Sequence, residues 1–349
     1  MQFKNVSIVS LGYELPPNAV TSEELEKRLA PLYERLKLPH GRLELMSGIK
    51  ERRFWNKGET PSSISSRVGE KTIASSGIPK EKITVVIHAS VCRDFLEPAT
   101  ANLVHHRLGL PDGATVFDIS NACLGVLNGM ITIGNMIEMG QADAGIVVSG
   151  EMGETLVNGT IDTLNKDTSL TRKSVKPAFA SLTIGSAGAA ILLARSDMVK
   201  EGRRLVGGVT RSATKYSELC RSNSGDTGVD SASTLLMNTD SEELMQAGCA
   251  LAGETFPLFK RAIGWNNDDI DRVFTHQVGS AHRKLMYESI GLDETKDFST
   301  LEFMGNTGSA ALPSAFAIGI ERGAVKKGDK IALLGIGSGL NTVMLGVEW

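Results

Sequence analysis

The sequence has few cysteines, little net charge and no long apolar run. Its four cysteines among 349 residues include no Cys-x-x-Cys pair, which favours a reducing cytoplasm over a disulfide framework. A net charge of −3 does not indicate the basic surface that binds nucleic acid. The longest nearly unbroken apolar stretch, Ala187 to Ala194, is far too short to span a bilayer. The opening MQFKNVSIVSLG has no cleavage site, so we expect a cytoplasmic protein without signal peptide or membrane span.

Several common functional motifs are also absent. No Gly-x-Ser-x-Gly elbow or P-loop occurs, and the Gly335/Gly337 run lacks the third glycine of a dinucleotide fingerprint. His105 and His106 are adjacent on a predicted helix and therefore point apart. The acidic cluster around Asp268 is typical of a helix start and loop rather than an ion site. We expect no metal site and no bound cofactor.

Strand and helix patterns alternate through the first part of the chain. Alternation of this kind requires crossover connections and predicts an α/β fold with a largely parallel sheet. Periodicity predicts strands at Val6–Leu11, Ile83–Ser90, Thr115–Ile119, Ala144–Gly150 and Ala187–Ala194, and helices at Ser22–Leu36, Ser62–Ser76, Thr100–Leu108 and Leu124–Met139.

After Arg195 a similar pattern begins again. The predicted elements are Leu205–Thr210, Glu242–Ile263, Arg272–His276, Ala281–Ile290, Ala310–Arg322, Lys330–Leu334 and Asn341–Glu348. Short matches link the two parts at offsets of 183, 187 and 188 residues, which indicates an internal duplication into residues 1–195 and 196–349. The offset of 183 carries Cys123 onto Asn306, so we expect these two residues to begin equivalent helices and to face each other across a pseudo-two-fold axis.

The stretch Val116 to Met130 contains the strongest candidate nucleophile. A β-rich run meets a small-residue elbow, Ser120–Cys123, and a helical pattern follows. A thiol in the first turn of a helix faces unpaired N–H groups and the positive end of the dipole, which favours the thiolate. The alternative is that Cys123 is an inert, buried small residue, as most free cysteines are.

Three further sites carry chemically useful groups. His276 ends a predicted buried strand, where the carboxyl ends of strands face the ligand crevice; otherwise it is a histidine bonded to backbone carbonyls. Asn306 follows Gly305, and a turn or helix cap is its ordinary role. The loop Gly335–Gly339 is either a plain turn or a place where backbone N–H groups form an oxyanion hole.

Motifs across nearly the whole chain resemble the thiolase superfamily, specifically the β-ketoacyl-ACP synthase III branch of condensing enzymes. They are the run Ser47–Arg53, the elbow Asp118–Cys123, Gly185–Ala190, His276-Gln277, Gly305-Asn306-Thr307 and the loop Gly335–Leu340. The resemblance implies a five-layered αβαβα fold of two duplicated halves with mixed, mainly parallel sheets, and a homodimer. It also implies a catalytic Cys123, His276 and Asn306, with an oxyanion hole formed by the N–H groups of Cys123 and Gly339.

Within that branch the segments 91–101 and 208–214 resemble the condensing enzymes of bacterial long-chain olefin biosynthesis, which join two fatty acyl-CoAs head to head. In ordinary synthase III proteins the position of Glu97 resembles a phenylalanine that crosses the dimer interface. A carboxylate there could remove the α-proton that a non-decarboxylating Claisen condensation must lose. The other interpretation is a surface glutamate beside a turn proline.

Two departures from the family pattern leave the binding of CoA or ACP open. Met304 stands where the family's common His-Gly-Asn has histidine, and Glu44–Met46 replace the Trp and Arg that clamp adenine in some members. Candidate phosphate contacts are Arg52, Arg53, Arg211 and Arg283, and further cations are Arg172, Lys173 and Lys176. Each alone is ordinarily a solvated surface charge. The polar segment Asn158–Lys176 is expected to be an inserted loop near the substrate entrance.

The resemblance implies an acyltransferase that performs Claisen condensation of acyl thioesters through an acyl-cysteine. Its first interpretation is non-decarboxylative joining of two fatty acyl-CoAs to a 2-alkyl-3-oxoacyl product. The alternative is a decarboxylating 3-oxoacyl-ACP synthase III that uses acyl-CoA and malonyl-ACP, with acyl carrier protein as a partner. A third interpretation, from another class of function, is a non-catalytic subunit with the condensing-enzyme fold. The intact set of Cys, His and Asn argues against it.

Overall fold

The computed structural model describes residues 1–200, 203–223, 236–276 and 278–349, so Gln277 of the His-Gln motif lies outside the described residues. Its main sheet has the strand order β11-β12-β13-β8-β1-β7-β6-β4-β5. These strands are β1 (Val6–Glu14), β4 (Ile83–His88), β5 (Thr115–Asp118), β6 (Ala144–Glu151), β7 (Ala187–Arg195), β8 (Arg204–Ser212), β11 (Arg272–Thr275), β12 (Lys330–Gly337) and β13 (Asn341–Glu348).

The strand order repeats between the two halves of the chain. In the first half β4, β6, β7 and β1 pair in that order, first parallel and then twice antiparallel. In the second half β11, β12, β13 and β8 pair in the same order and directions. The halves meet where β1 pairs with β8 at Ser7 and Arg204. The expected pair of duplicated halves is confirmed by this repeat.

The sheet is mixed, and its parallel pairs lie toward its two ends. β4 runs parallel to β5 and β6, and β11 runs parallel to β12. The five pairs between β6 and β12 along the order are antiparallel. The expectation of mainly parallel sheets therefore holds only in the outer parts. Of the antiparallel pairs, β12 and β13 are joined by a short link, which forces antiparallel pairing.

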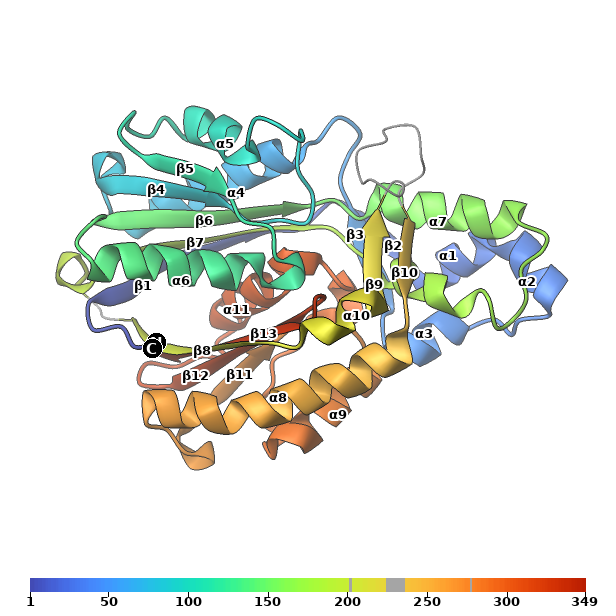
Figure 1. Ribbon diagram of the computed structural model, residues 1–349. Coiled ribbons are helices and arrows are strands. Elements are labelled where there is room, and N and C mark those ends of the chain that lie inside the picture. Colours follow the sequence, from blue (N-terminus) through green and yellow to red (C-terminus); the bar gives the residue numbers. More distant parts are fainter. Residues whose placement is uncertain (201–202, 224–235, 277) are drawn as a thin grey trace.

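Helices and strands form five layers (Figure 1). Helix α4 (Pro61–Ser76) packs on the outer side of β1, β6 and β7, next to α5 (Thr100–Leu108). Helices α6 (Gly125–Glu138) and α11 (Ala311–Glu321) lie between the strands of the two halves. Helix α8 (Ser241–Ile263) covers β8 and β13, and α9 (Ser280–Ile290) packs beside it. The layering is the αβαβα order that the family resemblance implied.

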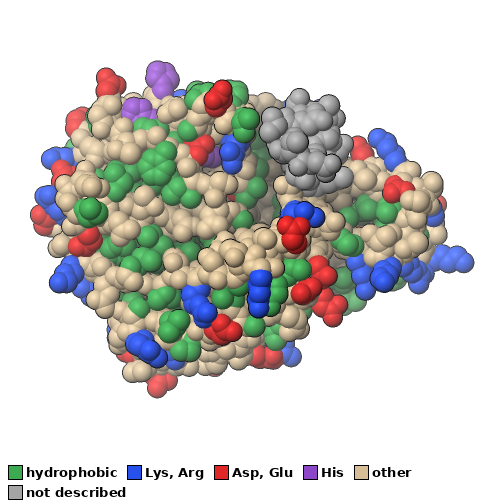
Figure 2. Space-filling model, viewed as in Figure 1, with side chains coloured by type: hydrophobic (Ala, Val, Ile, Leu, Met, Phe, Trp, Pro, Cys, Tyr) green, Lys and Arg blue, Asp and Glu red, His purple; other side chains and the backbone are tan. Residues whose placement is uncertain are grey.

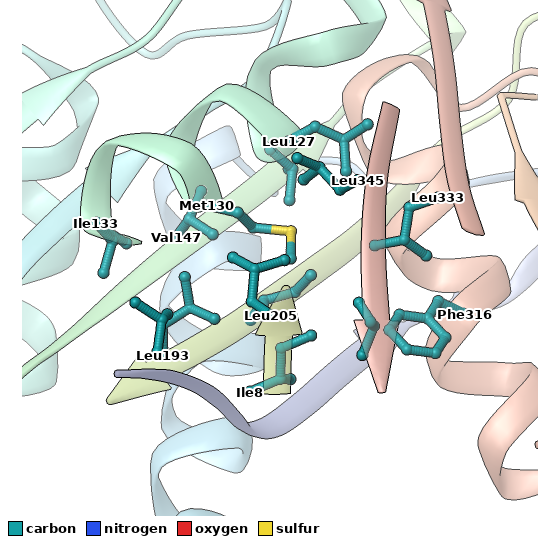
Figure 3. Packing of buried hydrophobic residues seen from close by; sticks show 14 of the residues in the cluster. Ile8, Leu127, Met130, Ile133, Val147, Leu193, Leu205, Phe316, Leu333 and Leu345 are labelled. Atoms are coloured by element: carbon teal, nitrogen blue, oxygen red, sulfur yellow. The ribbon is translucent and has the colours of Figure 1, made fainter. Parts of the chain in front are cut away.

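The middle layer is the core of the molecule. Leu127, Met130 and Ile133 of α6 pack with Leu193 from the first half and Leu345 from the second (Figure 3). A helix covered on both faces must be apolar nearly all round, and α6 is rich in buried glycine, valine, leucine and isoleucine. This burial fixes the position of the segment that immediately precedes α6.

A side lobe projects from the layered body, at the right in Figure 1. Its elements are β2 (Asn18–Thr21), α1 (Ser22–Arg28), α2 (Ala30–Leu36), α3 (Arg42–Ser47), β3 (Glu51–Phe54), α7 (Glu154–Lys166), β9 (Cys220–Asn223) and β10 (Leu236–Thr239). Leucines of α1 and α2 share a separate core with α7. Figure 2 shows Lys and Arg side chains at the outer end of this lobe.

The lobe corrects two sequence predictions. The predicted helix Ser22–Leu36 is divided at Leu29 into α1 and α2, because Pro31 is tolerated only in the first turn of a new helix. The predicted loop Asn158–Lys176 is helical as far as Lys166. Apolar residues in α7, among them Val157 and Ile161, lie four positions apart and are buried, so the polar residues between them occupy only its outer face.

Most other predicted elements are observed within a few residues of their expected ends. Helix α5 and strand β13 have the predicted bounds, and Thr21 caps α1 through a capping box with Glu24. Among the helices in the part of the chain that the structure describes, none is both long and apolar enough to cross a bilayer.

Arg52 of β3 is buried, with 1% of its surface exposed. Its guanidinium donates hydrogen bonds to Val20 O at 3.3 Å, Ser22 Oγ at 3.0 Å and Leu182 O at 3.2 Å. Burial lowers the pKa of this guanidinium to about 10. The prediction that Arg52 binds a CoA or ACP phosphate is therefore wrong, because its donors are turned to interior oxygens of the lobe.

We expect Gly335→Ala to destabilise the middle layer. A Cβ at position 335 would lie 2.6 Å from Leu124 Cδ2 and 2.7 Å from Leu127 Cδ1, so these two side chains, which are packed in the core, would have to shift. Overpacking of this kind costs about 1–3 kcal/mol, measured as a loss in the free energy of urea unfolding. Gly113→Ala is the matched control, because a Cβ there would meet open space. Equal stability of both variants would contradict the packing described here.

Replacing Arg52 with alanine should also destabilise the fold. Arg52→Ala leaves three interior oxygens without their donor and opens a void, which costs about 2–4 kcal/mol in urea unfolding. Arg195, an exposed arginine paired with Asp143 and Asp197, provides the control, and Arg195→Ala should leave the unfolding midpoint nearly unchanged. A midpoint for Arg52→Ala as high as that of the control would show that its interior bonds contribute little.

Candidate active site

Cys123 lies in a constrained turn between β5 and α6. A 3₁₀ turn at Ala122–Leu124 precedes the helix, and Ala122 has φ of 45°, in the left-handed region that alanine rarely adopts. Asn121 holds this turn from two sides. Its Nδ2 donates to Asn128 Oδ1 at 2.7 Å, and its Oδ1 accepts from Asn341 Nδ2 at 3.3 Å. The elbow that the sequence indicated is therefore fixed to both α6 and β13.

The surroundings of Cys123 favour the neutral thiol. Burial raises the pKa of the Cys123 thiol above its ordinary value, and Glu151 and Cys220 raise it further. The prediction that a helix start makes the thiolate is wrong for the resting chain. Helix α6 begins two residues later, and its Val126 N–H is already bonded to Ser309 Oγ at 3.0 Å.

The glycine loop lies directly against the nucleophile turn. Strand β12 continues to Gly337, which pairs with Asn341 of β13, so Ser338–Leu340 form the connecting link. A Cβ at Gly337 would lie 3.0 Å from Leu124 Cγ and 3.5 Å from the backbone nitrogen of Cys123. A side chain at this position would press on Leu124, so glycine favours this close approach. The structure thus brings together the two segments that carry Cys123 and Gly339, the predicted oxyanion pair.

His276 follows β11 and is buried beside β12. Its backbone N–H donates to Leu334 O at 3.2 Å, which aligns it with the strand that leads to Gly337. Among the residues that the structure describes, its Nδ1 has no hydrogen-bond partner. Burial, with a contribution from His282, lowers the pKa of the His276 imidazole to about 3, so the ring is neutral. An unpaired ring nitrogen in the interior does not match a histidine satisfied by backbone carbonyls.

Asn306 is fixed through its backbone and through its side chain. Its N–H donates to Thr183 O and its carbonyl accepts from Gly185 N–H, both at 2.9 Å. Its Oδ1 accepts from Gly308 N–H at 3.0 Å, which orients the side-chain NH₂ away from Gly308. A Cβ at Gly305, where φ is 66°, would lie 2.7 Å from Thr183 O, so this bend requires glycine.

The equivalence predicted for Cys123 and Asn306 is wrong by about one helical turn. The 3₁₀ turns that precede α6 and α11, Ala122–Leu124 and Gly308–Ala310, begin 186 residues apart, so the partner of Cys123 is Ser309. At the carboxyl-terminal ends of the two helices, Glu138 and Glu321, the offset is 183, because α11 is three residues shorter than α6. The segments still meet, since Ser309 Oγ bonds the start of α6.

Glu97 lies away from the interior, on an exposed segment of this chain. Large apolar side chains flank it: Val91, Phe95 and Leu96 are 49%, 50% and 71% exposed. Single exposed apolar residues are common, but three within six positions are typical of a contact surface. In the single chain Glu97 therefore lies at the surface.

The remaining phosphate candidates differ in availability. Arg53 bonds Pro16 O and Glu51, and Arg283 bonds the enclosed carboxylate of Asp297 at 2.5 Å. Arg211 is partly exposed and pairs with the exposed Glu254 at 3.1 Å. Of the further cations, Arg172 bonds Leu36 O and Lys37 O, whereas Lys173 and Lys176 are exposed. Arg211 is thus the most available of the four arginines for an incoming phosphate.

Sequence reasoning missed Glu151, the last residue of β6. It is 4% exposed, and its carboxylate accepts from Val91 N–H at 3.0 Å, Cys92 N–H at 3.3 Å and Ser309 N–H at 3.0 Å. Burial raises the pKa of this carboxyl, although the backbone donors act in the opposite direction. The available signal was a charged residue directly after the predicted buried strand Ala144–Gly150.

Two protein families match long parts of the chain. The family "Thiolase, N-terminal domain" matches residues 46–190, and "3-Oxoacyl-[acyl-carrier-protein (ACP)] synthase III C terminal" matches residues 260–349. Acyl-CoA:acyl-CoA alkyltransferases from Shewanella oneidensis and Xanthomonas campestris are each 38% identical, with 100% of both chains covered. A β-ketoacyl-ACP synthase III from Aliarcobacter butzleri is 28% identical, covering 95% of this chain and 94% of its own.

Solved structures give the same result. Cerulenin-bound OleA from Xanthomonas campestris superposes with a TM-score of 0.94 at 38% identity, covering 100% of this chain and 98% of that one. Other OleA structures that match carry substitutions at one cysteine, one glutamate or one histidine. Full-length identity, two family matches in the expected order and the repeated strand topology lead to one conclusion: this chain belongs to the thiolase superfamily, among the synthase III-like condensing acyltransferases.

Proposed function

We propose that this protein joins two fatty acyl-CoA molecules head to head by a non-decarboxylative Claisen condensation. The observation that carries the proposal is its 38% identity over the full length to two acyl-CoA:acyl-CoA alkyltransferases. The synthase III relatives from Aliarcobacter and Ruegeria stand at 28% and 25%. The proposal assigns the chemistry to Cys123, His276 and Asn306.

In the first half-reaction Cys123 is the nucleophile. Its sulfur attacks the thioester carbonyl of one acyl-CoA, and the N–H groups of Cys123 and Gly339 stabilise the oxyanion. The thiol and the His276 imidazole are both neutral at rest, so the thiol proton leaves as the attack proceeds. The carbon–sulfur bond to CoA breaks, the proton goes to the CoA thiol, and the acyl group remains on Cys123.

In the second half-reaction a new carbon–carbon bond forms. His276 and Asn306 hold the carbonyl of the second acyl-CoA, and the Gly308 N–H bond leaves the Asn306 NH₂ group available to donate. Glu97 of the partner subunit removes the α-proton. The resulting carbanion attacks the acyl-cysteine, and the bond to Cys123 breaks. The sulfur takes up a proton and Glu97 loses the one it had accepted, and a 2-alkyl-3-oxoacyl-CoA is released.

The role of Glu97 requires a second copy of the chain. Glu97 is exposed here, and the apolar side chains around it would be covered if this segment met its equivalent in a homodimer. The OleA structures with substitutions at a cysteine, a glutamate and a histidine match the residue types proposed at Cys123, Glu97 and His276. We infer a cytoplasmic homodimer that needs no cofactor beyond its acyl thioesters.

Two incubations test the reaction. Myristoyl-CoA alone should yield CoA and a 2-alkyl-3-oxoacyl product or its β-keto acid, followed by mass spectrometry. Acetyl-CoA with malonyl-ACP should yield no carbon dioxide. The reverse result, acetoacetyl-ACP and carbon dioxide with no product from myristoyl-CoA, would overturn the proposal in favour of a decarboxylating synthase III with acyl carrier protein as partner.

Cys123→Ala should abolish both half-reactions without unfolding the protein. Loss of the nucleophile should lower the rate of CoA release from myristoyl-CoA by at least about 10³-fold. The midpoint of urea unfolding should stay close to that of the unmodified chain. Cys249→Ala is the control, because Cys249 is a free, buried cysteine of the outer helix α8. CoA release by Cys123→Ala at the rate of this control would end the nucleophile assignment.

Glu97→Gln should separate the two half-reactions. We expect condensation to fall by about 10²–10⁴-fold because the base is lost, whereas one equivalent of CoA per site is still released during acylation.

A heterodimer of Glu97→Gln with Cys123→Ala, purified through two different tags, then tests the subunit assignment. It should regain about half of the wild-type condensation rate, since one site has both groups from different chains. An inactive heterodimer would place Glu97 in the same chain as its cysteine.

A further inference from the structure

Glu151 joins three segments of the site region in one buried contact. On one side its carboxylate accepts the backbone N–H groups of Val91 and Cys92, at the start of the exposed segment that continues to Glu97. On the other side it accepts the N–H of Ser309, in the 3₁₀ turn before α11. None of the steps proposed above uses this carboxylate, although it is nearly completely enclosed.

The contact continues to the nucleophile turn. Ser309 Oγ accepts Val126 N–H at 3.0 Å, in the first turn of α6 and three residues after Cys123. An unbroken series of hydrogen bonds thus links the segment before Glu97, the carboxylate, Ser309 and the start of α6. We propose that Glu151 is a positioning residue that holds the Glu97 segment and the Cys123 turn in one fixed arrangement, and that it brings its negative charge near the cysteine.

A carboxylate suits this place better than an amide. Its two oxygens face three N–H donors, with Oε1 receiving Val91 and Ser309 and Oε2 receiving Cys92. A glutamine in the same pose would turn its NH₂ group toward the Cys92 N–H, so two donors would face each other. The carboxylate is also closely packed, because a Cβ at Gly308 would lie 2.9 Å from Oε1.

Burial raises the pKa of the Cys123 thiol, and the negative charge of Glu151 raises it further. The titratable groups that raise the pKa of the Cys123 thiol are Glu151 and Cys220, and Cys92 is the titratable side chain that acts on Glu151. Removing the negative charge should therefore make the thiolate easier to form. A residue that only filled space would not change the pH at which Cys123 reacts.

Alkylation of Cys123 by iodoacetamide tests the proposal without any acyl substrate. The rate is followed from pH 6 to 11 by mass spectrometry of the peptide that contains Cys123. In Glu151→Gln the profile should move to lower pH, with a rate at fixed pH at least about threefold above that of the unmodified chain. Glu151→Asp keeps the charge and should keep the profile, which separates loss of charge from loosened packing.

Glu26 provides a matched control. It is 1% exposed, and its carboxylate accepts Gly41 N–H at 2.6 Å, Leu43 N–H at 2.8 Å and the Tyr33 hydroxyl at 3.1 Å, within the side lobe. Glu26→Gln should weaken the fold but leave the alkylation profile of Cys123 unchanged. An unshifted profile in Glu151→Gln, or an equal shift in Glu26→Gln, would overturn the proposal.

A second readout concerns the Glu97 segment and rests on the proposed function. Glu151→Gln should lower kcat of condensation at least about tenfold more than it lowers acylation of Cys123, with little change in KM, because the base loses its fixed position. Equal losses in both half-reactions would overturn the positioning role. If the protein condensed no acyl-CoA at all, the alkylation experiment would still decide the effect of Glu151 on Cys123.

Discussion

The whole site depends on the burial of α6 between the two halves of the sheet. Because strands of both halves cover this helix, its side chains are held in a close-packed core and its first turn cannot shift without disturbing both. Cys123 lies directly before that turn, and Gly337 of strand β12, from the second half, packs against the same segment. The duplicated fold therefore supplies a rigid base on which segments distant in sequence meet.

Enclosure also sets the electrostatic character of the site. It keeps the Cys123 thiol and the His276 imidazole neutral, and it leaves the carboxylate of Glu151 dependent on backbone donors. Neutral partners suit a reaction in which a proton must leave only when an acyl thioester has excluded the remaining water. The acidic group proposed to remove the α-proton stands apart, on an exposed segment.

Local patterns predicted much of the fold. Helix α5 and strand β13 were located at their observed ends, and the duplication was visible in short matches at a near-constant offset. The same patterns failed for α7, whose polar composition resembles a surface loop although one face of the helix is buried. They also failed for the helix starts, because α11 is about one turn shorter than α6. Offsets count residues, whereas equivalence in space depends on helix length.

The sequence by itself determined the identity of the candidate groups: a cysteine at a strand-to-helix elbow, a histidine at a strand end, an asparagine after glycine and a glutamate before proline. These are local features, and each is readable from its neighbours. Only the tertiary structure decided their states and partners. It buried Arg52, left Glu97 exposed and placed Glu151 between Val91 and Ser309, because burial and long-range hydrogen bonds depend on which surfaces meet after folding.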